Sequence, residues 1–193
     1  MMSNQRLWRW LALIFVLSFG ALGFIGYQIH LSAPPIPRAV VSADGSTLFT
    51  GEQIRAGQRA WLASGGQQQG SVWGHGSYVA PDWSADWLHR EAVALQAIRT
   101  QQHTTSLAPP TATERAAIDD ALKREMRHNG YDPATDTLTV GVERARAIRA
   151  TAAHYEALFG SDPALATLRG QYAMTAGELP VRADRDALTA FFF

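Results

Sequence analysis

The sequence predicts a mainly α protein with an N-terminal transmembrane helix, a small helical domain with a short hairpin, and a C-terminus at the start of a second transmembrane helix. Three observations lead to this fold class. They are an apolar run near the N-terminus, a series of helix-capping signals in the middle, and an aromatic C-terminal end. We expect residues 1–30 to form the cytoplasmic N-terminus and membrane helix, residues 31–185 the domain, and residues 186–193 a truncated second span.

The first membrane helix is predicted from the run Trp8 to Tyr27, which reads WRWLALIFVLSFGALGFIGY. About 20 apolar residues in a helix suffice to cross the apolar core of a bilayer, and the aromatic rings at both ends suit its two interfaces. Arg6 precedes the run and Arg9 is its second residue, whereas the next arginine is Arg38. The positive-inside rule therefore predicts a cytoplasmic N-terminus and a domain outside the cytoplasm.

Each end of the chain admits an alternative interpretation. A cleaved signal peptide shares the basic start and the apolar run, but Ala33 is followed by Pro34 rather than by a small-x-small site, so we expect an uncleaved anchor. At the other end, Asp184 and Asp186 precede ALTAFFF. Three terminal aromatic rings are unusual on a soluble surface. We expect a second membrane helix there, and the alternative is a segment docked into the domain's own core.

The domain between these ends is predicted to be built from a hairpin and several capped helices. The turn pair Asp44-Gly45 separates two short apolar strands, which indicates the hairpin. Thr50 with Gln53, and Thr111 with Glu114, have the spacing of capping boxes. The expected helices are 51–63, 84–102, 112–128, 142–159 and 163–174, the last capped by Asp162 and led by Pro163, with a short strand at 137–140.

The composition excludes several classes of function. The 17 basic and 17 acidic residues give no net charge, which argues against a nucleic-acid partner. The chain has no cysteine, so disulfides, thiolate metal sites and a thioether-linked haem are excluded. Its six histidines follow no metal-ligand spacing, and we find no nucleophile elbow and no phosphate-binding glycine motif. We therefore assign no catalytic, cofactor-binding or metal residue in this chain.

One loop and the helix start after it are unusually rich in aromatic rings. These rings either form the packed floor of a small domain or make a surface that docks on a partner or on the membrane interface. We expect Trp73 and Trp87 to be structural, and His75, Tyr78 and Trp83 to lie nearer an interface. Asp82 or Ser84 is expected to cap the helix that follows, and the carboxylates at its start are expected to have capping and dipole roles. The candidate interface residues are Trp73, His75, Tyr78, Asp82, Trp83 and Trp87.

The same region carries a resemblance to a known family. The stretch from Gly51 to Ala92, and above all GSVWGHGSYVAPDWSADWLHRE within it, resembles the N-terminal region of the single-subunit, quinol-dependent nitric oxide reductases of bacteria. The resemblance implies a first transmembrane helix, then a periplasmic domain with a cytochrome c-like fold but no haem, and then a membrane core of many helices. This layout covers the whole chain. The missing cysteines agree with a domain that holds no haem.

The resemblance also implies a role in denitrification within the haem–copper oxidase superfamily. In this family two nitric oxide molecules, two electrons and two protons give nitrous oxide and water, and the electrons come from quinol. The cofactors of the complete enzyme are b-type haems and a non-haem iron, held by histidines on membrane helices, and none of those ligands is assigned to this chain. The expected partners are the lipid bilayer, the transmembrane catalytic core and quinol, with the domain on the outer side of the bacterial inner membrane.

A rival hypothesis is a stand-alone, membrane-anchored interaction module without enzymatic activity. Both hypotheses share the anchor and the domain. A c-type cytochrome is a third interpretation, which the absence of cysteine disfavours. The quinol type, the residues that touch quinol and the oligomeric state do not follow from the sequence.

Overall fold

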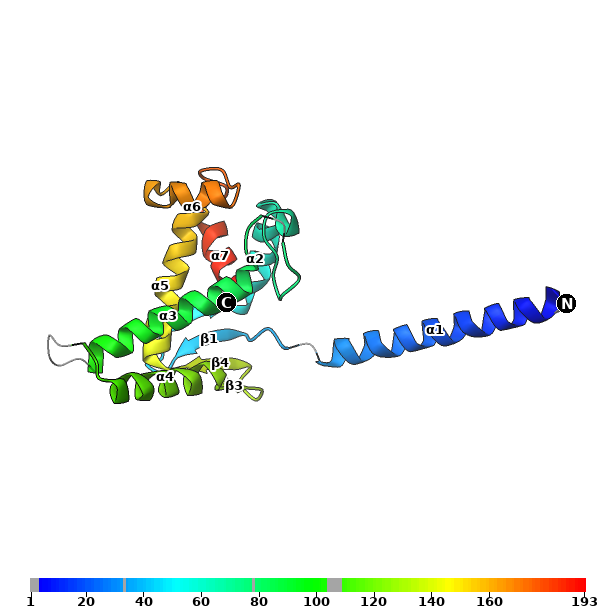
Figure 1. Ribbon diagram of the computed structural model, residues 1–193, viewed down its shortest axis with the longest axis horizontal. Coiled ribbons are helices and arrows are strands. Elements are labelled where there is room, and N and C mark those ends of the chain that lie inside the picture. The colour runs from blue at the N-terminus through cyan, green and yellow to red at the C-terminus, as the bar shows by residue number, and fades with distance from the viewer. Residues whose placement is uncertain (1–3, 33, 78, 104–108) are drawn as a thin grey trace. The chain divides into compact units, whose positions relative to one another are not determined.

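The computed structural model describes residues 4–32, 34–77, 79–103 and 109–193. It divides into two compact units, residues 1–36 and residues 37–193 (Figure 1). Tyr78, one of the candidate interface residues, lies outside the described residues.

The N-terminal unit is one long helix, α1, from Asn4 to Ser32. All of its residues are exposed, including a continuous apolar stretch, and in the part of the chain that the structure describes it is the helix long and apolar enough to cross a membrane. A helix of this length with no polar face lacks the one-sided pattern of a helix that packs on a soluble core. The predicted membrane-span candidate is thus present.

The second unit begins with a small mixed sheet of β1 (Ala39–Ser42), β2 (Thr47–Thr50), β3 (Tyr131–Asp132) and β4 (Thr137–Val140). The strand order is β2-β1-β4-β3. The predicted hairpin β1–β2 and the predicted strand β4 are confirmed. The parallel pairing of β1 with β4 was not predicted, since it joins segments far apart in the chain.

Helices form the rest of the second unit. Both predicted capping boxes are present, at Thr50 with Gln53 and at Thr111 with Glu114. The helix expected at 163–174 is shorter, because it opens as a 3-10 turn and the chain leaves the helix before Ala173, where φ is +52°. The helices are α2 (Gly51–Ala63), η1 (Gly66–Gln68), α3 (Trp83–His103), α4 (Ala112–Arg127), α5 (Val142–Leu158), η2 (Pro163–Leu165), α6 (Ala166–Gln171) and α7 (Arg182–Phe192).

The core lies where α3, α5 and α7 meet, and aromatic rings fill it. Trp87 stacks on Tyr155 with ring centroids 5.5 Å apart, and Trp83 stacks on Phe192 at 5.5 Å. The buried Trp87 indole donates to Glu91 Oε2 at 3.0 Å. Arg144 Nε donates to the other oxygen of Glu91 at 2.6 Å, so this fully buried carboxylate has a partner for each oxygen.

The C-terminal helix α7 belongs to this core. Leu188, Phe191 and Phe192 are buried, and α7 crosses α2 so closely that a side chain at Gly57 would meet the Ala187 carbonyl oxygen. Residues 186–193, expected as the start of a second membrane helix, therefore lie within the domain, and the structure supports the alternative of a segment docked into the domain's own core. The physical reason is that the rings of α7 find aromatic partners on α2 and α3.

Candidate functional site

The candidate site is the loop between α2 and α3, which runs beside the α2 label in Figure 1. Backbone bonds hold it in place, with Ala80 N–H donating to Gln69 O at 2.9 Å and Trp83 N–H donating to Ser71 O at 2.8 Å. The chain passes so close to the Trp83 indole that a Cβ at Gly70 would lie 2.1 Å from its Nε1 atom. Glycine at this position lets the loop fold back over the core.

Asp82 organises the loop and caps the helix after it. Its Oδ2 accepts from Ser71 Oγ and from Gly74 N, both at 2.7 Å, and its Oδ1 accepts from Ala85 N at 3.1 Å. Partial burial acts to raise the pKa of Asp82, but the hydrogen bonds from Ser71, Ala85 and Gly74 outweigh it and hold the pKa below its usual value. The expected capping role of Asp82 is confirmed.

The aromatic side chains of this region fall into a buried set and an exposed set. Trp83 and Trp87 are 1% and 0% exposed, whereas Trp73 is 68% exposed and His75 is also exposed. Trp87 is structural, as expected. Trp83, expected nearer an interface, is buried in the core, and Trp73, expected to be structural, is exposed. Composition alone could not separate them, because the backbone turn at residues 73–76 decides which ring faces inward.

The backbone at Trp73 is left-handed, with φ at +57°. This conformation is strained for a bulky residue and persists only where the surroundings hold it. Trp73 N–H donates to Ser84 Oγ at 3.2 Å, and the edge of its ring meets Phe191 with centroids 5.7 Å apart. Gly74 and Gly76, which follow, also have positive φ values of +81° and +71°. The loop thus presents one large exposed ring on a defined turn.

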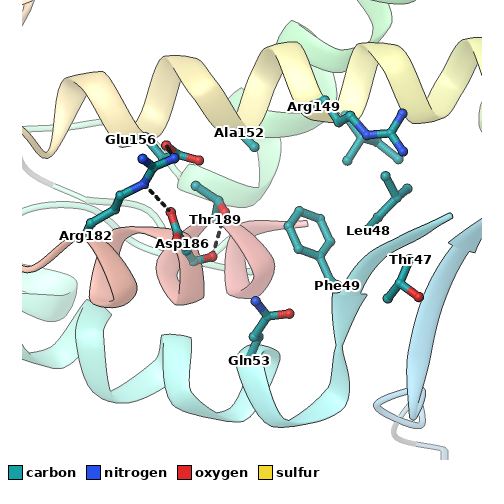
Figure 2. Close-up of a pocket in the computed structure, with 11 residues that line it drawn as sticks. Thr47, Leu48, Phe49, Gln53, Arg149, Ala152, Glu156, Arg182, Asp186 and Thr189 are labelled. Atoms are coloured by element: carbon teal, nitrogen blue, oxygen red, sulfur yellow. Dashed lines mark hydrogen bonds and ion pairs between the residues drawn. The ribbon is translucent and has the colours of Figure 1, made fainter.

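Apart from this loop, a hollow with a volume of about 280 Å³ lies between β2, α5 and α7 (Figure 2). Glu156, Arg182 and Asp186 lie at one end of it, and Arg149 lies at the other. Arg182 reaches within 3.8 Å of Glu156 and 3.9 Å of Asp186. Burial, followed by the charge of Asp186, raises the pKa of Glu156. Because these groups come from separate elements, no local motif predicted them, and their charges largely compensate one another.

The side chains present do not fit a covalently attached haem. A c-type haem needs cysteines for its thioether links, and this chain has none. The space beside Trp83 is occupied by the rings of Tyr155, Phe159, Tyr172 and Phe192, at centroid distances between 5.4 and 6.1 Å. Within the described residues, no group of three or more histidine or carboxylate side chains is placed to hold a metal ion. The rings around Trp83 therefore form a packed part of the core.

Comparison with known proteins identifies the second unit. A search of the curated proteins found no match. The family model for the NorB cytochrome c-like domain of nitric oxide reductase matches residues 37–193, which is the whole of the second unit and most of the chain. The match begins within the proline-rich linker after α1 and includes both the aromatic loop and α7. The chain therefore belongs to the NorB family of nitric oxide reductases and contains its cytochrome c-like domain.

Proposed function

We propose that this chain is the N-terminal anchor and extracytoplasmic cap of a quinol-dependent nitric oxide reductase. The observation that carries the proposal is the order of its parts, because a helix able to cross a membrane directly precedes the match to the NorB cytochrome c-like domain. In this role α1 holds the domain at the bilayer, and the chemistry takes place in a membrane core that lies beyond this chain.

The proposal gives the domain a structural task instead of an electron-carrying one. The packed rings around Trp83 and the absence of cysteine support a domain without haem. Electrons would then pass from quinol to the b-type haems and non-haem iron of the core without a stop in this domain. The exposed loop around Trp73 and His75 is the part best suited to shape the quinol entrance, because it offers an apolar ring beside polar groups.

The capping role is tested in the complete reductase with Trp73→Ala and His75→Ala, and with Val93→Ala, an exposed apolar residue on α3, as the matched control. We expect the two loop variants to lower quinol-driven nitric oxide reduction per folded enzyme. Turnover with an artificial donor that bypasses quinol should survive, and the control should be normal in both assays. Normal quinol-driven turnover in both loop variants would refute the entrance role.

The absence of haem from this domain is tested on the purified 193-residue chain. We expect no Soret absorbance and no stoichiometric iron or zinc after expression in cells that mature c-type cytochromes. One tightly bound haem per chain would overturn the haem-free cap. The same preparation should give a folded far-ultraviolet dichroism spectrum, so that a missing cofactor is not confused with a missing fold.

A further inference from the structure

The segment from Ala60 to Pro81 contains no Asp, Glu, Lys or Arg, although charged residues make up 18% of the chain. We call this segment the uncharged lobe. It comprises the end of α2, η1 and most of the loop before α3. Exposed loops usually carry charge, and charge is depleted where a surface is buried against a partner. Part of the segment is buried in the domain, and its exposed residues form an uncharged surface of the kind that loses water when it meets a partner.

The lobe exposes large apolar side chains. Leu62 is 60% exposed and Val79 is 48% exposed, in addition to Trp73. The polar side chains within the segment itself are neutral amides, hydroxyls and the exposed imidazole of His75. Indole rings beside neutral hydrogen-bonding groups are typical of the layer between the headgroups and the acyl chains of a bilayer.

The position of Trp73 is built into the fold. Asp82 accepts hydrogen bonds from the loop at Ser71 and Gly74, and Ser84 accepts from Trp73 itself. These partners hold a left-handed backbone that places the ring outward while its edge rests on Phe191. A ring fixed in this way loses little conformational freedom when it inserts into a partner, which favours binding.

We infer that the uncharged lobe rests in the interfacial layer of the same bilayer that α1 spans, with Trp73 as its main insertion. This inference rests on the anchoring role proposed for α1. Residues 33–38 connect α1 to β1 and can extend at most about 20 Å, so the domain is covalently held near a membrane surface. Such a tether makes a weak interfacial contact effective, because the second contact becomes intramolecular.

Because the lobe carries no charge, its contact with the bilayer should depend neither on anionic lipid nor on salt. Attraction of basic residues to anionic lipid weakens with salt, whereas insertion of an indole ring does not. The lobe should therefore insert equally into bilayers of phosphatidylcholine alone and into bilayers that also contain phosphatidylglycerol. Raising the ionic strength should leave the contact unchanged.

The test uses the 193-residue chain in nanodiscs of phosphatidylcholine brominated near the upper part of its acyl chains. The Trp73 contribution is the difference in fluorescence between the wild type and Trp73→Phe. This subtraction removes the signals of the five other tryptophans. We expect brominated lipid to quench most of this difference signal, and iodide in the buffer to quench it weakly. Phosphatidylglycerol and high salt should change neither result.

A matched control places a tryptophan elsewhere, with Val142→Trp in the Trp73→Phe background. Val142 is exposed at the start of α5. Phe159, just after the other end of that helix, packs on Trp83, which lies against Gly70 of the lobe. The control ring should be quenched by iodide and not by brominated lipid. If the Trp73 signal is quenched by iodide and spared by brominated lipid, the inference is wrong, and a protein surface of the reductase core becomes the better partner. Quinol-driven turnover is a separate measurement, so failure here leaves the capping role standing.

Discussion

At the scale of single residues, the tryptophans of the candidate site show how burial separates similar side chains. Trp73 and Trp83 have the same chemistry and lie ten positions apart, yet one is exposed and the other fills the core. The capping role of Asp82 could be predicted because caps depend on local spacing. The orientation of Trp73 could not, since it depends on the left-handed turn and on Phe191, far away in the chain.

This separation predicts different costs for the same substitution. Trp83→Ala should lower the free energy of unfolding by about 3–5 kcal/mol, because it leaves a cavity among Tyr155, Phe159 and Phe192. Trp73→Ala should cost about 1 kcal/mol or less, since it removes one ring contact from the surface. Urea unfolding of the chain in detergent measures both. Equal losses would contradict the burial of one ring and the exposure of the other.

Asp82 also predicts a pH dependence. Its pKa is lowered in the folded chain, so its contribution to stability is complete above the unfolded pKa of about 3.9 and is lost as the pH falls through the folded value. Asp82→Asn lacks this titration. Between about pH 5 and about pH 3, the urea midpoint of the wild type should fall more steeply than that of the variant. Parallel curves would contradict the role of the ionised carboxylate.

At the scale of elements, local signals predicted most helices and the hairpin, whereas the packing of these elements could not be predicted from the sequence. Both capping boxes and the turn at Asp44-Gly45 act within a few residues, so their patterns can be read directly. The parallel pairing of β1 with β4 and the crossing of α2 over α7 join distant segments. The second membrane helix was predicted from the terminal rings. Composition could not decide this point, because a helix whose apolar face packs on other rings has the same composition as one that faces acyl chains.

The crossing of α2 over α7 predicts an asymmetric pair of glycine substitutions. In Gly57→Ala the new methyl group would lie 2.1 Å from the Ala187 carbonyl oxygen, so the helices must separate at a cost of about 1–3 kcal/mol or more. In Gly170→Ala, within α6, the methyl group meets no atom within 4 Å. That change should be neutral or stabilise by up to about 1 kcal/mol, since alanine favours helix. Thermal unfolding distinguishes the two, and an innocuous Gly57→Ala would argue against the close crossing.

At the scale of the whole molecule, the chain joins a candidate membrane span to a domain of a nitric oxide reductase family. The family could be expected from the loop sequence, and the mainly helical fold from the capping signals. Orientation rests on a different kind of signal, the arginines at the N-terminal end of the span, Arg6 and Arg9. Because these charges act during insertion into the membrane, the structure of the folded domain does not show the orientation.

Orientation is tested by labelling in sealed cells. The absence of native cysteine means that one introduced thiol gives an unambiguous signal. A cysteine at Pro109 should react with a membrane-impermeant reagent from outside, while a cysteine at Ser3 should react only after the cells are permeabilised. The reverse pattern would place the domain in the cytoplasm and remove the basis for an extracytoplasmic cap.

The parallel pairing of β1 with β4 has a consequence for the order in which the domain forms. Val40 lies beside Leu138 of β4, so β1 cannot pair with β4 until most of the domain has been synthesised. Contacts between distant segments slow folding, because the entropy of closing a long loop is lost before the stabilising contacts form. We expect chains arrested before β4 to expose the first hairpin to protease and longer chains to protect it. The first hairpin should therefore gain its protection only after β4 has been synthesised.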